Sequence, residues 1–334
     1  MIDMAAITPE AWESASLKGA VTSVAIASPP VVEFTLTDEH GNPVVGLEGI
    51  TAKSATATVA SYPNVSFALA KLLPRTDTKP SSWVSYIVTT VPTTSASSSC
   101  APNAGCPTRP STDNTGKLEA VAGKPGSYKY TFYRDVPGAK AAVAAMAASA
   151  AALNPNNIVA DLGDLTYDPT LPHRLTIQVG GAAPGTGTNT TNAVTVTPAV
   201  NLANPINVTY DFKPGAAGQP GTPIPPADLT REDVNIASCN VCHGKLAFHG
   251  GSARVETRYC VVCHTEQFAY GQAKVTSTAG SFPALTETKA VSATTGIASF
   301  TYSPSTNVAD GEVTYRGVAD AFGLDYHPAE ELLG

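Results

Sequence analysis

The sequence has few charged residues, few methionines and no long apolar run. Charged residues make up 14% of the 334 residues, and the formal charge is −7, which argues against nucleic acid as a partner. No run of 18 or more apolar residues exists, so no segment of the sequence has the composition of a membrane-spanning helix. The start, Met1-Ile2-Asp3-Met4, lacks the basic segment and apolar core of a signal peptide. We expect an export signal that was removed or lies outside this numbering.

Short segments rich in Val, Thr and aromatic residues alternate with Gly, Pro, Asn and Asp turns, which is typical of β-strands. The pattern predicts a mainly β N-terminal domain, either a Greek-key split barrel or a sandwich. Apart from an alternating segment at residues 21–26, the strands are expected at residues 31–37, 44–45, 65–73, 83–88, 127–133, 174–179 and 193–200.

Three other segments interrupt this pattern. Residues 8–18 are expected to form a helix, with Thr8 as N-cap and Pro9 in the first helical position. The Ala-rich residues 139–153 predict a second helix. Residues 89–116, which are rich in Ser and Thr, predict a long surface loop.

A change of composition divides the chain. Residues 213–226 are rich in Pro and Gly and are expected to link two parts. We therefore predict an N-terminal β-domain over residues 1–212 and a loop-rich segment over residues 227–334, in which Cys and His cluster.

Two CxxCH motifs in the second part predict two covalently bound haem c groups. They are Cys239-Asn240-Val241-Cys242-His243 and Cys260-Val261-Val262-Cys263-His264. In such a motif the two thiols form thioethers to the haem vinyl groups, and the following His reaches the iron. About 0.002 chance matches are expected in a chain of this composition. The four cysteines would attach the haems, and His243 and His264 would each be an axial ligand.

A four-cysteine zinc site is the main alternative, because its spacing matches that of the two cysteine pairs. Zinc does not require a His after each pair, and both pairs have one. A thioredoxin-like redox pair lacks its βαβ setting here. The two remaining cysteines, Cys100 and Cys106, flank a loop with Pro and Gly and are expected to form a disulfide, which would indicate an oxidising compartment.

The second axial ligand is expected to be histidine, because none of the three methionines lies in the haem segment. His40 lies in a predicted turn and is expected to be solvated. His173 lies at a strand start in the β-domain and is expected to be structural. His249, which is followed by two glycines, and His327 are the candidate distal ligands.

Iron with two histidine ligands has no open position for a substrate, which favours outer-sphere electron transfer over substrate conversion. We therefore expect an exported electron-transfer protein. Two alternatives stay open. The β-domain can instead be a docking module for a partner cytochrome, a porin or a mineral surface, and a five-coordinate haem would make a reductase.

The haem segment and parts of the β-domain resemble the OmcA/MtrC family of outer-membrane decahaem c-type cytochromes. The similar stretches are residues 237–251, 259–264, 8–12, 30–34, 67–72, 82–87 and 172–175. The resemblance implies alternating β and multihaem domains on the outer face of the outer membrane, often with a lipid anchor; the periplasm is the alternative location. It also implies other multihaem cytochromes or a porin–cytochrome complex as partners, and metal oxides, flavins or electrodes as electron acceptors.

The sequence departs from the family in three places. It has two haem motifs where the family has about ten. Thr265-Glu266 stands where the family usually has Asn-Pro after the second motif. The segment Tyr326-His327-Pro328-Ala329-Glu330-Glu331-Leu332 keeps one His of the family's His-x-x-His. We therefore expect either the N-terminal portion of a longer cytochrome or a short two-haem relative.

Overall fold

Two β-sheets stacked face to face form the main body of the protein. The structure is a computed structural model. It describes residues 1–77, 80–92, 105–145, 162–225, 228–229, 231, 235–248, 253–265, 267, 285–291 and 298–304.

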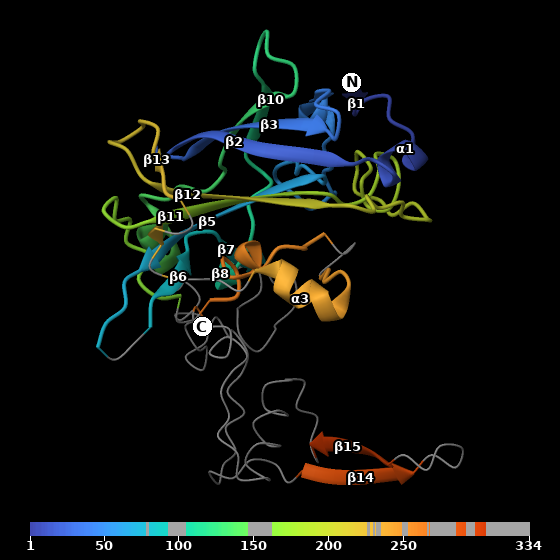
Figure 1. Cartoon of the computed structure of the whole chain (residues 1–334), viewed down its shortest axis with the longest axis vertical. Helices are drawn as coiled ribbons and strands as arrows, with labels where there is room; N and C mark the ends of the chain where they lie inside the picture. The colour runs from blue at the N-terminus through green and yellow to red at the C-terminus, as the bar shows by residue number, and fades with distance from the viewer. Residues whose placement is uncertain are drawn as a thin grey trace.

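The first sheet has four antiparallel strands in the order β2-β3-β10-β9. Its strands are β2 (Leu17–Ala25), β3 (Val31–Asp38), β9 (Lys117–Ala120) and β10 (Ser127–Thr131). The second sheet has five antiparallel strands in the order β13-β12-β11-β5-β6. Its strands are β5 (Val65–Leu73), β6 (Ser82–Ser85), β11 (His173–Val179), β12 (Ile206–Lys213) and β13 (Thr222–Pro223). Figure 1 shows the two layers.

The remaining elements lie outside these two sheets. They are β1 (Ile2–Asp3), α1 (Pro9–Glu13), β4 (Val44–Val45), η1 (Leu47–Gly49), β7 (Val88–Pro92), β8 (Gly105–Pro110), α3 (Ile236–His243), α4 (Thr257–Cys260), β14 (Leu285–Val291) and β15 (Ala298–Pro304). Among them, β14 and β15 pair with each other. Figure 1 shows α3 on the side of the five-stranded sheet that faces away from β2 and β3. Within the described part of the chain, every helix is too short or too polar to cross a bilayer.

Alternating side chains explain the stacking. In β3, Val32, Phe34 and Leu36 are buried and contribute to the core between the sheets. Aromatic rings fill the centre of this core, where Phe67 of β5 stacks on Tyr130 of β10 with ring centroids 3.9 Å apart. Such ring pairs stabilise a core beyond the area that they bury.

Strand β5 is buried on both faces. Phe67 and Leu69 belong to the core between the sheets, whereas Ala68, Ala70 and Leu72 belong to a second apolar cluster. Successive side chains of a strand point to opposite faces, so this second cluster lies on the outer face of the five-stranded sheet. The apolar side chains on the outer face are shielded from water by the segment that contains the second CxxCH motif, through Val262.

The mainly β character predicted from the sequence is confirmed, and the described strands form stacked sheets that do not close into a barrel. Thr8 caps α1 as predicted, but the helix ends at Glu13 and the chain enters β2 at Leu17, so the predicted helix 8–18 is too long. Residues 193–200 form no strand, which contradicts the prediction. The predicted loop 89–116 contains most of the β7–β8 strand pair.

The Ala-rich stretch and the Pro/Gly segment are described in part. Residues 139–145 are helical, and the rest of the predicted helix lies outside the described residues. Within residues 213–226, β13 pairs with β12, and Gly221 donates a backbone hydrogen bond to Val24 of β2 (2.8 Å). The division into domains stays a prediction.

Candidate functional site

The first CxxCH motif lies on α3. Asn235 caps the helix, since its side chain accepts a hydrogen bond from the Ala237 N–H (2.8 Å). The helix ends at His243, and the capping residue that follows, Gly244, has a φ of +68°, which suits glycine. Cys239 and Cys242 are three residues apart on this helix and therefore share one face.

The first motif lies at the surface. Cys242 is exposed, and 84% of Val241 and 55% of Phe248 are exposed, which is unusual for such apolar side chains. Lys245 connects this region to the sandwich: it donates hydrogen bonds from Nζ to the carbonyl of Ala203 (2.9 Å) and to Asn204 Oδ1 (3.2 Å).

Phe248, which precedes His249, pairs with Arg254, which lies five residues after it. Phe248 and Arg254 exchange two backbone hydrogen bonds, of 2.9 and 3.2 Å. His249 itself lies outside the described residues, as do His327 and Cys100. The two distal-ligand candidates and the Cys100–Cys106 disulfide therefore stay predictions.

The second motif begins on α4. Glu256 caps this helix by accepting a hydrogen bond from the Arg258 N–H (3.2 Å). The turn continues through the motif, because the N–H groups of Cys263 (3.0 Å) and His264 (2.9 Å) both donate to the carbonyl of Cys260. The two thiols are thus one helical turn apart, as in the first motif.

Both thiols of the second motif are partly buried and free. Burial raises the pKa of the Cys263 thiol to about 11 and also raises the pKa of Cys260, while the nearby positive charge of Arg254 acts in the opposite direction on both. His264, the next residue, is exposed.

The second motif is docked on the outer face of the five-stranded sheet. Val262 is fully buried and packs in one cluster with Ala68, Ala70, Leu72 and Trp83. Val262 and Val241 occupy the same position in their motifs, yet one is 0% and the other 84% exposed. The two candidate sites therefore have opposite environments.

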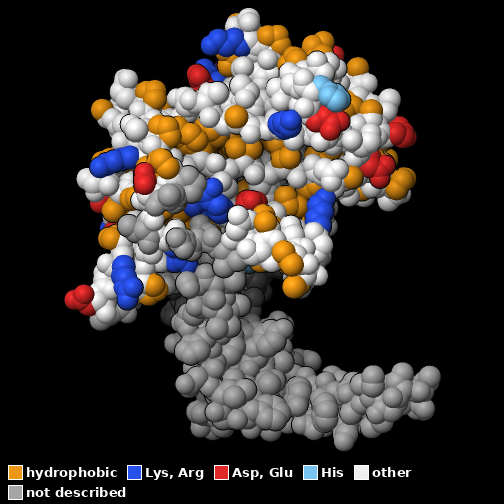
Figure 2. Space-filling view, viewed as in Figure 1, with side chains coloured by type: hydrophobic (Ala, Val, Ile, Leu, Met, Phe, Trp, Pro, Cys, Tyr) orange, Lys and Arg blue, Asp and Glu red, His pale blue; other side chains and the backbone are white. Residues whose placement is uncertain are grey.

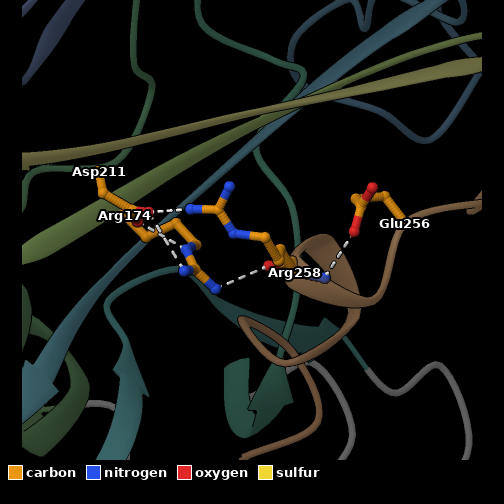
Figure 3. A network of polar contacts seen from close by, with 4 residues as sticks. All are labelled: Arg174, Asp211, Glu256 and Arg258. Carbon is orange, nitrogen blue, oxygen red and sulfur yellow. Dashed lines mark hydrogen bonds and ion pairs between the residues drawn. The ribbon is translucent and has the colours of Figure 1, made fainter. Parts of the chain in front are cut away.

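A buried ionic network fixes this docking, as Figure 3 shows. Arg174 of β11 and Asp211 of β12 face each other across neighbouring strands and form a two-pronged ion pair of 2.7 and 3.2 Å. Both side chains are almost completely buried. Arg258 of α4 adds a second ion pair to Asp211, and its carbonyl accepts a hydrogen bond from Arg174 Nη1 (3.2 Å).

A second clamp holds the chain just after the motif. The side chain of Gln267 accepts a hydrogen bond from the Ser85 N–H (2.5 Å) and donates to the Ser85 carbonyl (2.9 Å). It also donates to the carbonyl of Leu162 (2.7 Å). The chain is therefore tied to the sheet on both sides of the second motif.

The other histidines behave as expected from the sequence. His40 is exposed in the predicted turn. His173 is fully buried, with Nε2 3.1 Å from the Tyr86 hydroxyl and Nδ1 2.9 Å from the Leu171 carbonyl. Burial lowers its pKa to about 4, so the ring is neutral near pH 7.

The described residues contain no group of three or more His, Cys, Asp or Glu side chains placed to hold one metal ion. Each cysteine pair instead lies on its own helical turn. The charged side chains on the face drawn in Figure 2 are scattered, with Lys and Arg among Asp and Glu.

Comparisons with known proteins give the following. No protein-family model and no curated protein matches the chain. The structure is similar to that of MtrC from Shewanella baltica OS185, with 22% identity and a TM-score of 0.42, over 75% of this chain and 30% of that one. It is also similar to the outer membrane decahaem cytochrome OmcA, with 20% identity and a TM-score of 0.47, over 82% of this chain and 32% of that one. The chain thus spans less than a third of the length of either protein. MtrC and OmcA are the two proteins that give its name to the family that the sequence resembles.

Proposed function

We propose that the chain is an exported multihaem c-type cytochrome that carries two haem c groups and transfers electrons toward an extracellular acceptor. The observation that carries this proposal is the pair of CxxCH motifs, each with its thiols one helical turn apart. That donor set fits a haem: two thiols on one face of a turn, then a histidine.

The cysteines and histidines would have separate roles in haem attachment and iron ligation. Cys239 and Cys242 would hold the first haem and Cys260 and Cys263 the second. His243 and His264 would each supply one axial nitrogen, and His249 and His327 are the candidates for the opposite positions. A haem with two histidine ligands supplies reversible one-electron transfer with little rearrangement.

The surroundings of the two motifs support the proposal. Val241 within the first motif and Phe248, five residues after it, have exposed apolar side chains, and an attached ring would cover apolar surface there. The second motif is held rigidly on the sheet, and a rigid support is what a redox site needs in order to keep its ligands in place.

Acceptors and partners are proposed from the family resemblance. Metal oxides or flavins would be the acceptors, and other multihaem cytochromes or a porin–cytochrome complex would be the partners. The location would be the outer face of the outer membrane or the extracellular space. Terminal reduction of a metal would follow from outer-sphere transfer and needs no substrate-binding position on the iron.

The haem count after production in an export-competent host tests the proposal. We expect two haems per chain by alkaline pyridine absorbance, and low-spin signals of bis-histidine ligation by electron paramagnetic resonance. The double variant Cys239→Ala/Cys242→Ala and the double variant Cys260→Ala/Cys263→Ala should each lose one haem. The matched control, Cys100→Ser/Cys106→Ser, should keep both. A protein with no haem absorbance that binds stoichiometric zinc would refute the proposal.

A further inference from the structure

The ionic network of Figure 3 joins two sheet strands to the helix that begins the second motif. Arg258 lies two residues before Cys260, and its guanidinium pairs with Asp211 of β12. Asp211 is 47 residues away in the sequence, so this contact exists only in the folded chain. The network is therefore a long-range connection between the β-sandwich and the second attachment site.

Arg174 is held from several sides at once. It forms the two-pronged ion pair with Asp211, donates to the carbonyl of Arg258, and lies with its guanidinium carbon 4.3 Å from the centre of a Trp83 ring. Trp83 packs in turn in the cluster that contains Val262, which lies between the two cysteines. Apolar and ionic contacts thus converge on the same short segment.

A buried ion pair is a poor source of net stability, since the desolvation of both charges offsets their attraction. The planar, two-pronged contact between a guanidinium and a carboxylate instead fixes the relative orientation of the two side chains. Arg174 and Asp211 are both almost fully buried, whereas the side chain of Arg258 is 26% exposed at the edge of the pair. Arg258 is therefore the member whose loss disturbs the sheet least.

We propose that Arg258, through its ion pair with Asp211, is a positioning residue for the second haem. It holds α4 at one orientation on the sheet, and so fixes the direction in which Cys260, Cys263 and His264 present their ligand atoms. This inference rests on the proposed function and deepens it.

Among the residues that the structure describes, the first motif has no comparable ion pair to a buried carboxylate. The position that corresponds to Arg258, two residues before the first cysteine, is Ala237. Lys245 ties that region to a backbone carbonyl and an asparagine side chain, both at the surface. The two proposed haem sites can therefore be compared within one chain: the second motif is anchored to the buried carboxylate of Asp211, and the described contacts of the first motif include no such carboxylate.

The test uses the holoprotein in the background Cys239→Ala/Cys242→Ala, which carries the second haem alone. We compare Arg258→Gln, which removes the ion pair with Asp211, with Lys245→Gln, which removes one positive charge from the region of the first motif. The position and width of the low-spin ferric signal depend on how the axial ligands are oriented. We expect Arg258→Gln to shift or broaden the signal and to speed amide hydrogen exchange over residues 253–264 by about tenfold or more. Lys245→Gln should change neither.

A variant that keeps the charge separates geometry from electrostatics. Arg258→Lys retains the positive charge and loses the planar fork, so we expect a signal broader than that of the parent. In a second variant, Arg174→Met/Asp211→Leu, apolar side chains replace the buried pair and Arg258 loses its acceptor. That protein should fold and show the same altered signal as Arg258→Gln.

The outcomes separate the positioning role of Arg258 from the proposed function. If the background protein carries no haem, the proposed function fails. If it carries the haem and Arg258→Gln leaves both the signal and the exchange rate unchanged, the positioning role of Arg258 is wrong and the proposed function stands. An equal change in Lys245→Gln would also overturn the positioning role.

Discussion

Replacing Val262 by Ala should destabilise the protein, whereas the same replacement at Val241 should not. The two valines occupy the same position in the two motifs, but Val262 is 0% and Val241 84% exposed. Val→Ala removes two carbons, each worth about 0.8 kcal/mol when buried, and leaves part of a cavity. We therefore expect Val262→Ala to lower the free energy of unfolding by about 2 kcal/mol. Val241→Ala should change it by less than about 0.5 kcal/mol.

Urea unfolding followed by far-ultraviolet circular dichroism measures this difference. The signal reports the sheets, so it responds to Val262 only if the second motif and the five-stranded sheet unfold together. With a urea dependence of about 2–3 kcal/mol per M, the midpoint of Val262→Ala should fall by about 0.7–1 M. Equal midpoints for the two variants would show that the motif does not contribute to the stability of the sandwich, and the docking described above would be wrong.

Three further predictions concern the sandwich itself. Asp211→Asn removes the carboxylate charge that pairs with the buried Arg174 and with Arg258, and should cost about 3–5 kcal/mol, most of which the double change to Met and Leu should restore; urea midpoints measure both. The folded-state pKa of His173 is about 4, below its unfolded value of 6.5, so the unfolded chain binds the proton first. Stability should therefore fall by up to about 3 kcal/mol between pH 6.5 and pH 4, and His173→Gln should flatten that pH profile. Gly116→Ala would place a methyl group against the backbone carbonyl of Thr131 in β10 and should lower the thermal midpoint. Gly49→Ala, where the added carbon has no neighbouring atom within 4 Å, should not lower it.

Much of the β-sandwich could be predicted from local patterns. The apolar run at residues 65–73 gave the bounds of β5 because such a run fits a strand that is buried on both faces. The same local rule failed at residues 193–200, where Val196 makes an isolated bridge to Gly187 instead of extending into a strand, and Val194 and Val196 are exposed. β12 was missed although Ile206, Val208, Tyr210 and Phe212 alternate, a signal that the sequence contains.

The candidate site divides in the same way. The cysteine spacing is local, so the sequence alone defines both motifs. The docking of one motif is not local, because Val241 and Val262 are the same residue in the same position and differ in what folds against them. Asp211 lies 37 residues from Arg174 and 47 from Arg258, and only the register of β11 with β12 brings the three together. A pattern can therefore identify which residues would hold a haem, but the docking of the second motif depends on strand pairing that no short motif encodes.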